Sequence, residues 1–194
     1  MTGMTGDSRA GSTNAAGIAH NPGRVGERLE ALGAYRLARQ RLLSVLDLAA
    51  SNRDPLAEFS EQFVAALLGG RLAASRVQAG YDITTPTGQT VQVRYLANTG
   101  AAWVNEHQVM GLPGADLYAL VIFEGFATVA VLLFPQQLAP ICTALGKRHP
   151  AQNTTLQFTR RNLMTIRDDP ARFTALGMQV WFPPFSGRRQ HTTE

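Results

Sequence analysis

Lysine and cysteine are nearly absent from this chain, which has one of each among 194 residues, Lys147 and Cys142. A single cysteine excludes an intrachain disulfide and any metal site built from several thiolates. Cys142 lies in an apolar stretch of helical character, where a buried structural role is expected. No apolar run reaches the roughly 18 residues that span a bilayer, and the N-terminus lacks the apolar core of a signal peptide. We therefore expect a cytoplasmic protein with no membrane partner.

Charge is also scarce, and it is unevenly distributed. Apolar residues make up 45% of the chain and charged residues 16%, which is typical of a globular protein. The formal net charge is +4, and beyond Pro140 eight basic residues face three acidic ones. A basic C-terminal third either contacts phosphate or is ordinary solvated surface, and charge alone favours neither.

The sequence divides into four parts. Residues 1–26 are rich in small polar residues without apolar periodicity, so we expect a disordered tail. Residues 27–51 carry leucines at helical spacing among arginines, which predicts an N-terminal helical arm. An α/β domain should follow over residues 52–183, and residues 184–194 should form a flexible tail.

Helix and strand signals alternate within the predicted domain. Asp54 is a suitable N-cap for a helix over Pro55–Leu68, and Gly69-Gly70 should end it. Four segments predict strands: Gly80–Thr85, Thr90–Leu96, Asp116–Phe123 and Ala127–Phe134. Between them we expect a loop with a short helix near Trp103–Met110. Beyond them the expected elements are helices at Pro135–Leu145, Thr159–Ile166 and Pro170–Leu176 and a strand at Thr154–Phe158. The fold class is α/β, a mixed sheet flanked by helices.

One group of polar residues has a chemical character. Asp82 lies in the first predicted strand, and the turn Pro86–Gln89 brings the second strand back beside it. Gln92 and Arg94 lie on this second strand and share one face, because strand side chains alternate. Glu61 lies upstream on the predicted helix. A carboxylate on a sheet near a second one on a helix suits Mg²⁺, which prefers hard oxygen ligands.

These segments together resemble a known family. The runs Glu61–Gly69, Gln78–Ile83 and Val91–Arg94 look like the PD-(D/E)XK restriction-endonuclease-like superfamily. They are closest to the members with the pattern E…GYD…QxK, the Mrr-like and Holliday-junction-resolvase-like enzymes. The resemblance covers about 75 residues and rests on short motifs.

The resemblance implies a site for each of these residues. Asp82 would bind the catalytic Mg²⁺ (or Mn²⁺), Gln92 would fill the second sheet position, and Glu61 would be the helix acid. Arg94 stands where the family has lysine, and it would contact the phosphate of DNA. A guanidinium keeps the positive charge but does not take a proton from water.

Plainer interpretations exist for the same residues. Asp82 could be a turn residue, with Gln92 and Arg94 on the wet face of a strand. Trp103, His107 and Tyr118 are weaker candidates that could simply pack. Arg160 and Arg161 follow the N-cap candidate Thr159, so they suit phosphate binding at a helix N-terminus or ordinary surface.

Three functional hypotheses remain open from the sequence. The first is a Mg²⁺-dependent deoxyribonuclease, and the second is a catalytically inactive nuclease-like module that binds DNA. The third is an assembly protein without nucleic acid, in which the helical arm forms a homodimer. Metal-dependent cleavage separates the first from the second, and salt-sensitive DNA binding separates both from the third.

Overall fold

The computed structural model describes residues 22–49, 51, 53–74, 80–147, 149 and 154–183. The chain divides into two compact units, Met1–Leu42 and Leu43–Glu194. The predicted α/β domain, residues 52–183, lies within the second of these units. The predicted tail 184–194 and residues 1–21 of the predicted tail 1–26 lie outside the described residues.

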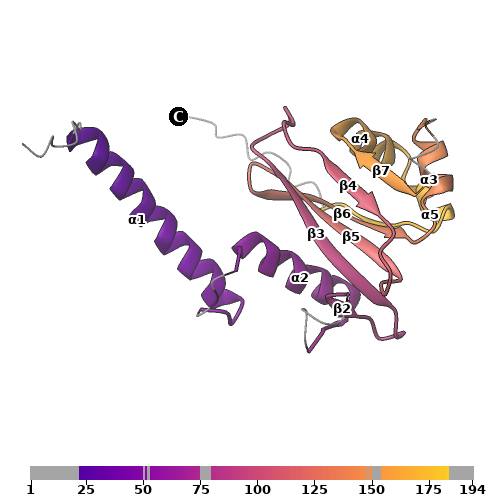
Figure 1. Cartoon of the computed structure of the whole chain (residues 1–194), viewed down its shortest axis with the longest axis horizontal. Coiled ribbons are helices and arrows are strands. Elements are labelled where there is room, and N and C mark those ends of the chain that lie inside the picture. Colours follow the sequence, from indigo (N-terminus) through magenta and orange to yellow (C-terminus); the bar gives the residue numbers. More distant parts are fainter. Residues whose placement is uncertain are drawn as a thin grey trace, which may run out of the picture. The chain divides into compact units, whose positions relative to one another are not determined.

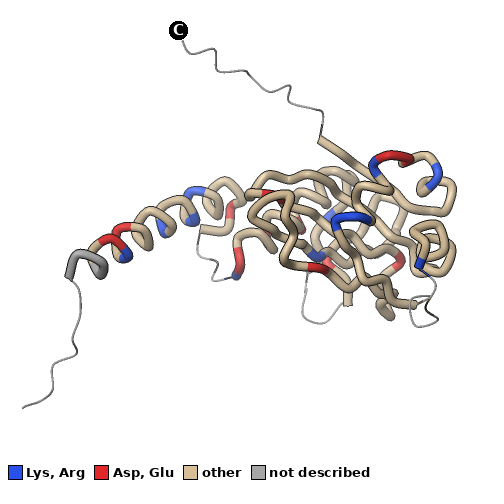
Figure 2. Tube along the Cα trace, turned by 90° about the horizontal axis from the view of Figure 1, so that it is seen from above, with Lys and Arg blue, Asp and Glu red and all other residues tan. Residues whose placement is uncertain are grey.

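The first unit contains most of helix α1 (Pro22–Val45). The helix begins before the predicted arm 27–51 and ends before Ser51. Several of its apolar side chains are exposed to solvent, among them Leu29, Leu32 and Leu37. Basic and acidic residues both occur along this helix (Figure 2).

Helix α2 (Pro55–Leu68) has the predicted bounds because local signals mark both of its ends. The Asp54 side chain accepts a hydrogen bond from the Leu56 N–H, which is the usual N-cap contact. At the other end, Gly69 has φ of +62°, a left-handed conformation that glycine adopts without a Cβ clash. Its N–H donates to the carbonyl oxygens of the last turn.

A mixed sheet of six strands forms the centre of the second unit, in the order β1-β2-β3-β5-β6-β8. Only β3 and β5 run parallel; the other neighbours are antiparallel. The strands are β1 (Arg71–Leu72), β2 (Ile83–Thr84), β3 (Thr90–Asn98), β5 (Leu117–Glu124), β6 (Ala127–Pro135) and β8 (Gln179–Trp181). The four predicted strands thus share one sheet, although β2 is shorter than the predicted Gly80–Thr85.

Side chains on the two faces of this sheet form two separate apolar cores. On one face, Val91, Val93 and Val121 pack with Val64 of α2. On the other face, Leu120 and Ile122 belong to a larger core. Figure 1 shows α2 on one side of β3 and β5, with β4 (His107–Met110), β7 (Thr155–Phe158) and α4 (Arg160–Asp168) on the other. The near-continuous apolar runs of β5 and β6 follow from this double coverage.

One segment was assigned incorrectly from the sequence, and one strand was missed. The predicted short helix near Trp103–Met110 contains strand β4 instead, which pairs antiparallel with β7 to form a second sheet. Val109 and Leu156 face each other in this pair, and both are fully buried. The hydrogen bonds of β4 are therefore satisfied by a segment distant in sequence. Strand β8 was not predicted at all.

The C-terminal helices agree broadly with the predictions, although their bounds differ. Helix α3 spans Ala139–Ala144 and α5 spans Pro170–Ala175. Helix α4 begins after Thr159, whose N–H and hydroxyl both donate to the Asn162 side-chain oxygen. None of the helices among the described residues combines the length and apolarity needed to cross a bilayer.

The turn between β5 and β6 contains a residue in an unusual conformation. The two-residue loop consists of Gly125 and Phe126, with φ of +58° and +62°. Two positive φ values fit the twist of a tight hairpin, but the second position normally holds glycine. A left-handed conformation costs a residue with a Cβ about 1–2 kcal/mol. The Phe126 side chain is nevertheless 78% exposed, so packing does not offset this cost.

Candidate functional site

The hairpin of β2 and β3 positions the centre of the candidate site. Its turn is held by Thr85, whose N–H donates to the Gln89 carbonyl oxygen and whose hydroxyl accepts from the Gln89 N–H. Register pairs Ile83 with Val91, so Asp82 lies opposite Gln92. Because Val91 and Val93 face α2, Gln92 and Arg94 face the opposite side of the sheet, as the alternation predicts.

Asp82 is buried and receives two hydrogen bonds on one oxygen. Its Oδ2 accepts from the amide nitrogen of Gln92 and, at 2.8 Å, from the Val93 N–H. Asp82 is only 5% exposed and Gln92 only 7%. A buried carboxylate needs such donors, because an uncompensated charge away from water is costly. Asp82 and Gln92 therefore form a rigid polar pair on the sheet.

Arg94 brings a positive charge to the same pair. Its Nη1 lies 3.8 Å from Asp82 Oδ2 and donates to the Val93 carbonyl oxygen at 2.8 Å. The Arg94 side chain is 52% exposed, so much of the guanidinium remains open to solvent. It can bind a phosphate oxygen while its alkyl stem stays on the sheet.

His107 and Tyr118 extend this polar group across the sheet. Tyr118 on β5 is the register partner of Gln92, and its hydroxyl lies 2.6 Å from His107 Nε2 on β4. Burial lowers the pKa of His107 below its usual value, and the positive charge of Arg94 lowers it further. Burial raises the pKa of Tyr118 to about 12, although Arg94 opposes the rise. Both rings are therefore uncharged near neutral pH.

The placement of His107 depends on β4 and so on its pairing with β7. From the sequence, His107 and Tyr118 were only weak candidates, since no local pattern links β4 to the sheet. What connects them to the site is their position in the folded chain, where the charge of Arg94 lowers the pKa of both groups.

Glu61, the fourth predicted residue, occupies a buried position on α2, the helix that packs on the other face of the sheet. Its Oε1 accepts from Arg53 at 2.8 Å, and the same guanidinium lies 3.1 Å from Glu58. This pairing places Glu61 in an ionic group at the start of α2. The predicted convergence of Glu61 with Asp82 stays a prediction.

Arg160 and Arg161 open helix α4 at the far end of β5. Arg160 Nε donates to Glu124 Oε1 at 3.0 Å, and the Trp103 indole donates to the same oxygen at 2.6 Å. Arg160 therefore has an anionic partner within the protein, while Arg161 is exposed. Trp103 also packs on Phe158, so it is partly a core residue.

The donor set allows only an incomplete metal centre. Among the residues that the structure describes, no three His, Cys, Asp or Glu side chains are grouped to hold a metal. Asp82 has protein donors on one oxygen, and Gln92 turns its amide nitrogen toward that oxygen. Mg²⁺ is commonly held by one or two carboxylates together with waters and substrate phosphates. The residues fit such a substrate-completed site, with Asp82 as the main ligand, and do not form a cage of protein ligands.

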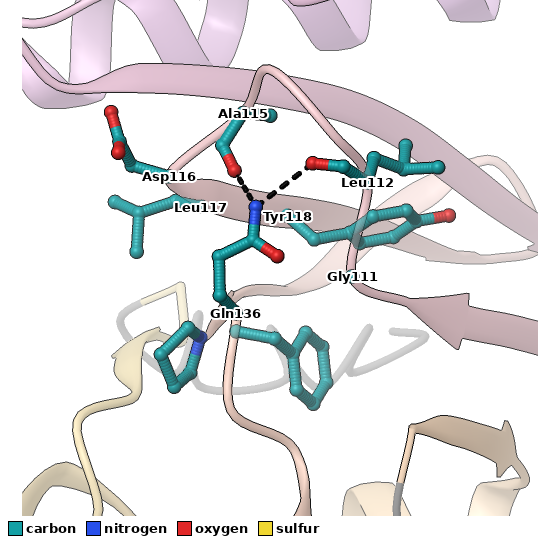
Figure 3. Close-up of a pocket in the computed structure, with 9 residues that line it drawn as sticks. Gly111, Leu112, Ala115, Asp116, Leu117, Tyr118 and Gln136 are labelled. Carbon is teal, nitrogen blue, oxygen red and sulfur yellow. Dashed lines mark hydrogen bonds between the residues drawn. The ribbon is translucent and has the colours of Figure 1, made fainter.

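A small hollow lies behind Tyr118, at the start of β5. Gln136 closes it by donating from its side-chain nitrogen to the carbonyl oxygens of Leu112 and Ala115 (Figure 3). The space left in it for a water-sized molecule is about 0 Å³, so it is too small for a ligand. Gln136 instead fixes the loop that follows β4, and this loop helps to position Tyr118.

Comparisons with known proteins leave the family open. No protein-family model matches this chain, and no curated protein matches it. The resemblance to the PD-(D/E)XK superfamily therefore rests on the residues of the chain itself.

Proposed function

We propose that this chain is a restriction-endonuclease-like protein that acts on DNA and hydrolyses its phosphodiester bonds with Mg²⁺ or Mn²⁺. The observation that carries the proposal is the contact of Asp82, Gln92 and Arg94 on one polar patch. They stand on a helix–hairpin unit in the order that the resemblance requires. A buried carboxylate is costly without compensating donors, and Asp82 receives such donors from Gln92 and Val93.

The residues have separate roles in the proposed reaction. Arg94 binds a nonbridging phosphate oxygen and stabilises the negative charge that develops there. Asp82, supported by Gln92, would hold the cation, which would supply positive charge to the phosphate and lower the pKa of a bound water. The water oxygen bonds to phosphorus and the bond from phosphorus to a sugar oxygen breaks; the attacking water loses a proton to a base or to solvent, and the leaving sugar oxygen takes a proton from solvent. The sheet contains no lysine, and His107, whose pKa is lowered by burial and by the charge of Arg94, is an uncharged base on strand β4.

Two observations favour the inactive-module alternative. Asp82 is already satisfied by donors from β3, and Arg94 lies where it would repel a cation. A domain that only binds DNA would keep Arg94 and need no metal. The assembly alternative has a different support, the exposed apolar side chains of α1.

Cleavage of supercoiled plasmid with Mg²⁺ or Mn²⁺, run beside a gel shift in EDTA, tests the proposal. We expect nicking by the wild type, none by Asp82→Ala or Arg94→Ala, and maintained or higher activity for Arg94→Lys. A lysine ammonium is compact and can approach the attacking water where a planar guanidinium cannot. Arg94→Ala should retain metal binding, because the lost group acts on the phosphate.

The remaining outcomes distinguish the alternatives. A wild type that shifts DNA but never cuts, with cleavage created by Arg94→Lys, identifies an inactive nuclease-like module. Absence of both cleavage and shift at low salt, with single-stranded, duplex and branched DNA, would reject both nucleic-acid functions.

A further inference from the structure

Two exposed apolar side chains stand out on the second unit. Among its described residues after α1, the large hydrophobic side chains that are exposed are Val104 at 81% and Phe126 at 78%. Phe126 forms the tip of the β5–β6 hairpin, and Val104 lies in the loop between β3 and β4. A single exposed apolar residue is ordinary, but two at the same end of a sheet call for an explanation.

Hydrogen bonds hold these two residues at the same end of the sheet. Asn98, the last residue of β3, is buried; its side-chain oxygen accepts from the Val104 N–H at 3.0 Å. The Asn98 carbonyl oxygen accepts from the Gly125 N–H at 2.8 Å, directly beside Phe126. One residue therefore fixes both the loop and the hairpin tip. We call Val104 and Phe126, with Arg160 and Arg161, the hairpin-end surface.

Two guanidinium groups lie at the base of the hairpin. Glu124, which precedes Gly125, accepts from Arg160, the first residue of α4. Arg161 follows it and is exposed. Glu106, in the loop that carries Val104, is also exposed, so two arginines stand with two glutamates here, and Arg160 is the one paired with Glu124. The combination of an exposed aromatic ring with guanidinium groups is the one that nucleobases and phosphates bind.

The hairpin-end surface is also aligned with the proposed site. Asn98 pairs with Glu124, and Arg94 pairs with Leu120, four residues earlier on the same two strands. Arg94, Asn98 and Glu124 alternate onto one face of the sheet. At the usual rise per residue, the end of β3 lies about 13 Å from Arg94. A DNA strand bound at Arg94 would reach the hairpin tip within a few nucleotides.

Phe126 keeps its left-handed backbone although glycine or asparagine would be more favourable there. An unfavourable backbone conformation that carries an exposed aromatic ring is typical of a functional position. We propose that Phe126 is a stacking platform for an unpaired DNA base, with Arg160 and Arg161 contacting the adjacent phosphates. The inference rests on the proposed DNA function and adds a preference for single-stranded or frayed DNA.

The test is fluorescence anisotropy with a labelled single-stranded oligonucleotide and a labelled blunt duplex, in EDTA at low salt. Phe126→Asn removes the ring and suits the left-handed backbone, so it should raise the melting temperature. We expect it to weaken single-strand binding by about tenfold, since one lost base stack has an effect of that size, and to leave duplex binding unchanged. Phe126→Trp, the matched control, should retain binding and show tryptophan quenching upon stacking.

Each other outcome has a defined meaning. If wild type and Phe126→Asn bind the single strand equally, the stacking role is rejected while the DNA function stands. If the wild type binds no DNA, both are rejected. If Phe126→Asn instead abolishes self-association measured by light scattering, the hairpin tip contacts a second copy of the chain, and the stacking role is rejected.

Discussion

Asp82 carries a negative charge in a buried position, and β3 supplies the groups around it. Gln92 and Val93 donate to the carboxylate, and Arg94 lies nearby. The amide at position 92 is uncharged, so the site contains one acidic group where a Mg²⁺ centre would often use two. The charge at residue 92 therefore determines how strongly this part of the sheet attracts a cation.

Gln92→Glu should convert the pair into a stronger metal site. Without metal, two carboxylates within hydrogen-bonding distance repel each other, so the melting temperature should fall at neutral pH. Added Mg²⁺ should restore it, since a ligand at 100 times its Kd stabilises the folded state by about 2.7 kcal/mol. Thermal unfolding with and without Mg²⁺ measures both effects. Gln92→Met is the control, and an equal response to Mg²⁺ in both variants would contradict a metal role for position 92.

His107 should make the stability of the protein sensitive to mild acid. Its pKa is lowered in the folded state, so between that value and the usual 6.5 the unfolded chain binds more protons. Stability should thus fall as the pH drops below about 6.5 and should not depend on this residue above it. Denaturant unfolding from pH 8 to 5 measures the slope. His107→Gln should flatten it; an unchanged slope would mean that His107 is not held uncharged beside Tyr118 and Arg94.

Helix α2 is connected to the sheet through its N-cap. Asp54 accepts the Leu56 N–H with one carboxylate oxygen, and the Tyr95 hydroxyl donates to the other. This hydrogen bond is the largest cause that raises the pKa of Tyr95 to about 12, followed by burial and the charge of Asp54. Asp54 thus has two roles, the N-cap of α2 and the contact to Tyr95 on the sheet. Substitutions of Asp54 can distinguish the two roles, because only the second affects the pKa of Tyr95.

Asp54→Asn should keep the N-cap role and change the contact to Tyr95. Asparagine is an equally good N-cap, so stability should change little, but the pKa of Tyr95 should fall below about 12 because an uncharged amide oxygen is a weaker acceptor than a carboxylate and the negative charge is gone. Asp54→Ala should lower the pKa in the same way and also cost about 0.5–2 kcal/mol of stability. Phenolate absorbance during alkaline titration, with Tyr95→Phe to identify the signal, measures the shift. A Tyr95 pKa that stays near 12 in Asp54→Ala, which has no acceptor at this position, would show that burial, not Asp54, raises it.

Local signals determine which elements were predictable. Both ends of α2 carry their own caps, and the β2–β3 turn lies within the hairpin that it closes, so alternation placed Gln92 and Arg94 correctly. Strand β4 depends on β7, and β8 depends on β6, across long stretches of chain. No short window contains that information. His107 was for the same reason only a weak candidate.

At the scale of the whole chain, the exposed side of α1 needs an explanation. Leu29, Leu32 and Leu37 are each at least 60% exposed, and the helix carries charges of both signs. Helices with exposed leucines commonly pair with another helix. The assembly alternative predicts that this side of α1 packs against the α1 of a second copy of the chain.

Leu29→Glu combined with Leu32→Glu should abolish such a dimer. Because both positions are exposed and lie in the first unit, the melting transition of the second unit should not change. Light scattering over a range of concentrations gives the molar mass of wild type and variant. Leu29→Ala with Leu32→Ala is a milder control that should weaken association less. A wild type that is monomeric at all concentrations would reject the assembly role of α1.

The pairing of β4 with β7 also has a consequence for the order of folding. The two strands are joined by register pairs such as His107 with Phe158, which lie 51 residues apart in the sequence. Contacts of such long sequence separation form late, since loop closure must precede them. The hairpin that holds Asp82 can form early from local contacts, whereas His107 reaches its place only after β7 has docked. During synthesis on the ribosome the polar pair on β2 and β3 therefore precedes the complete site, which is assembled only when the C-terminal third has emerged.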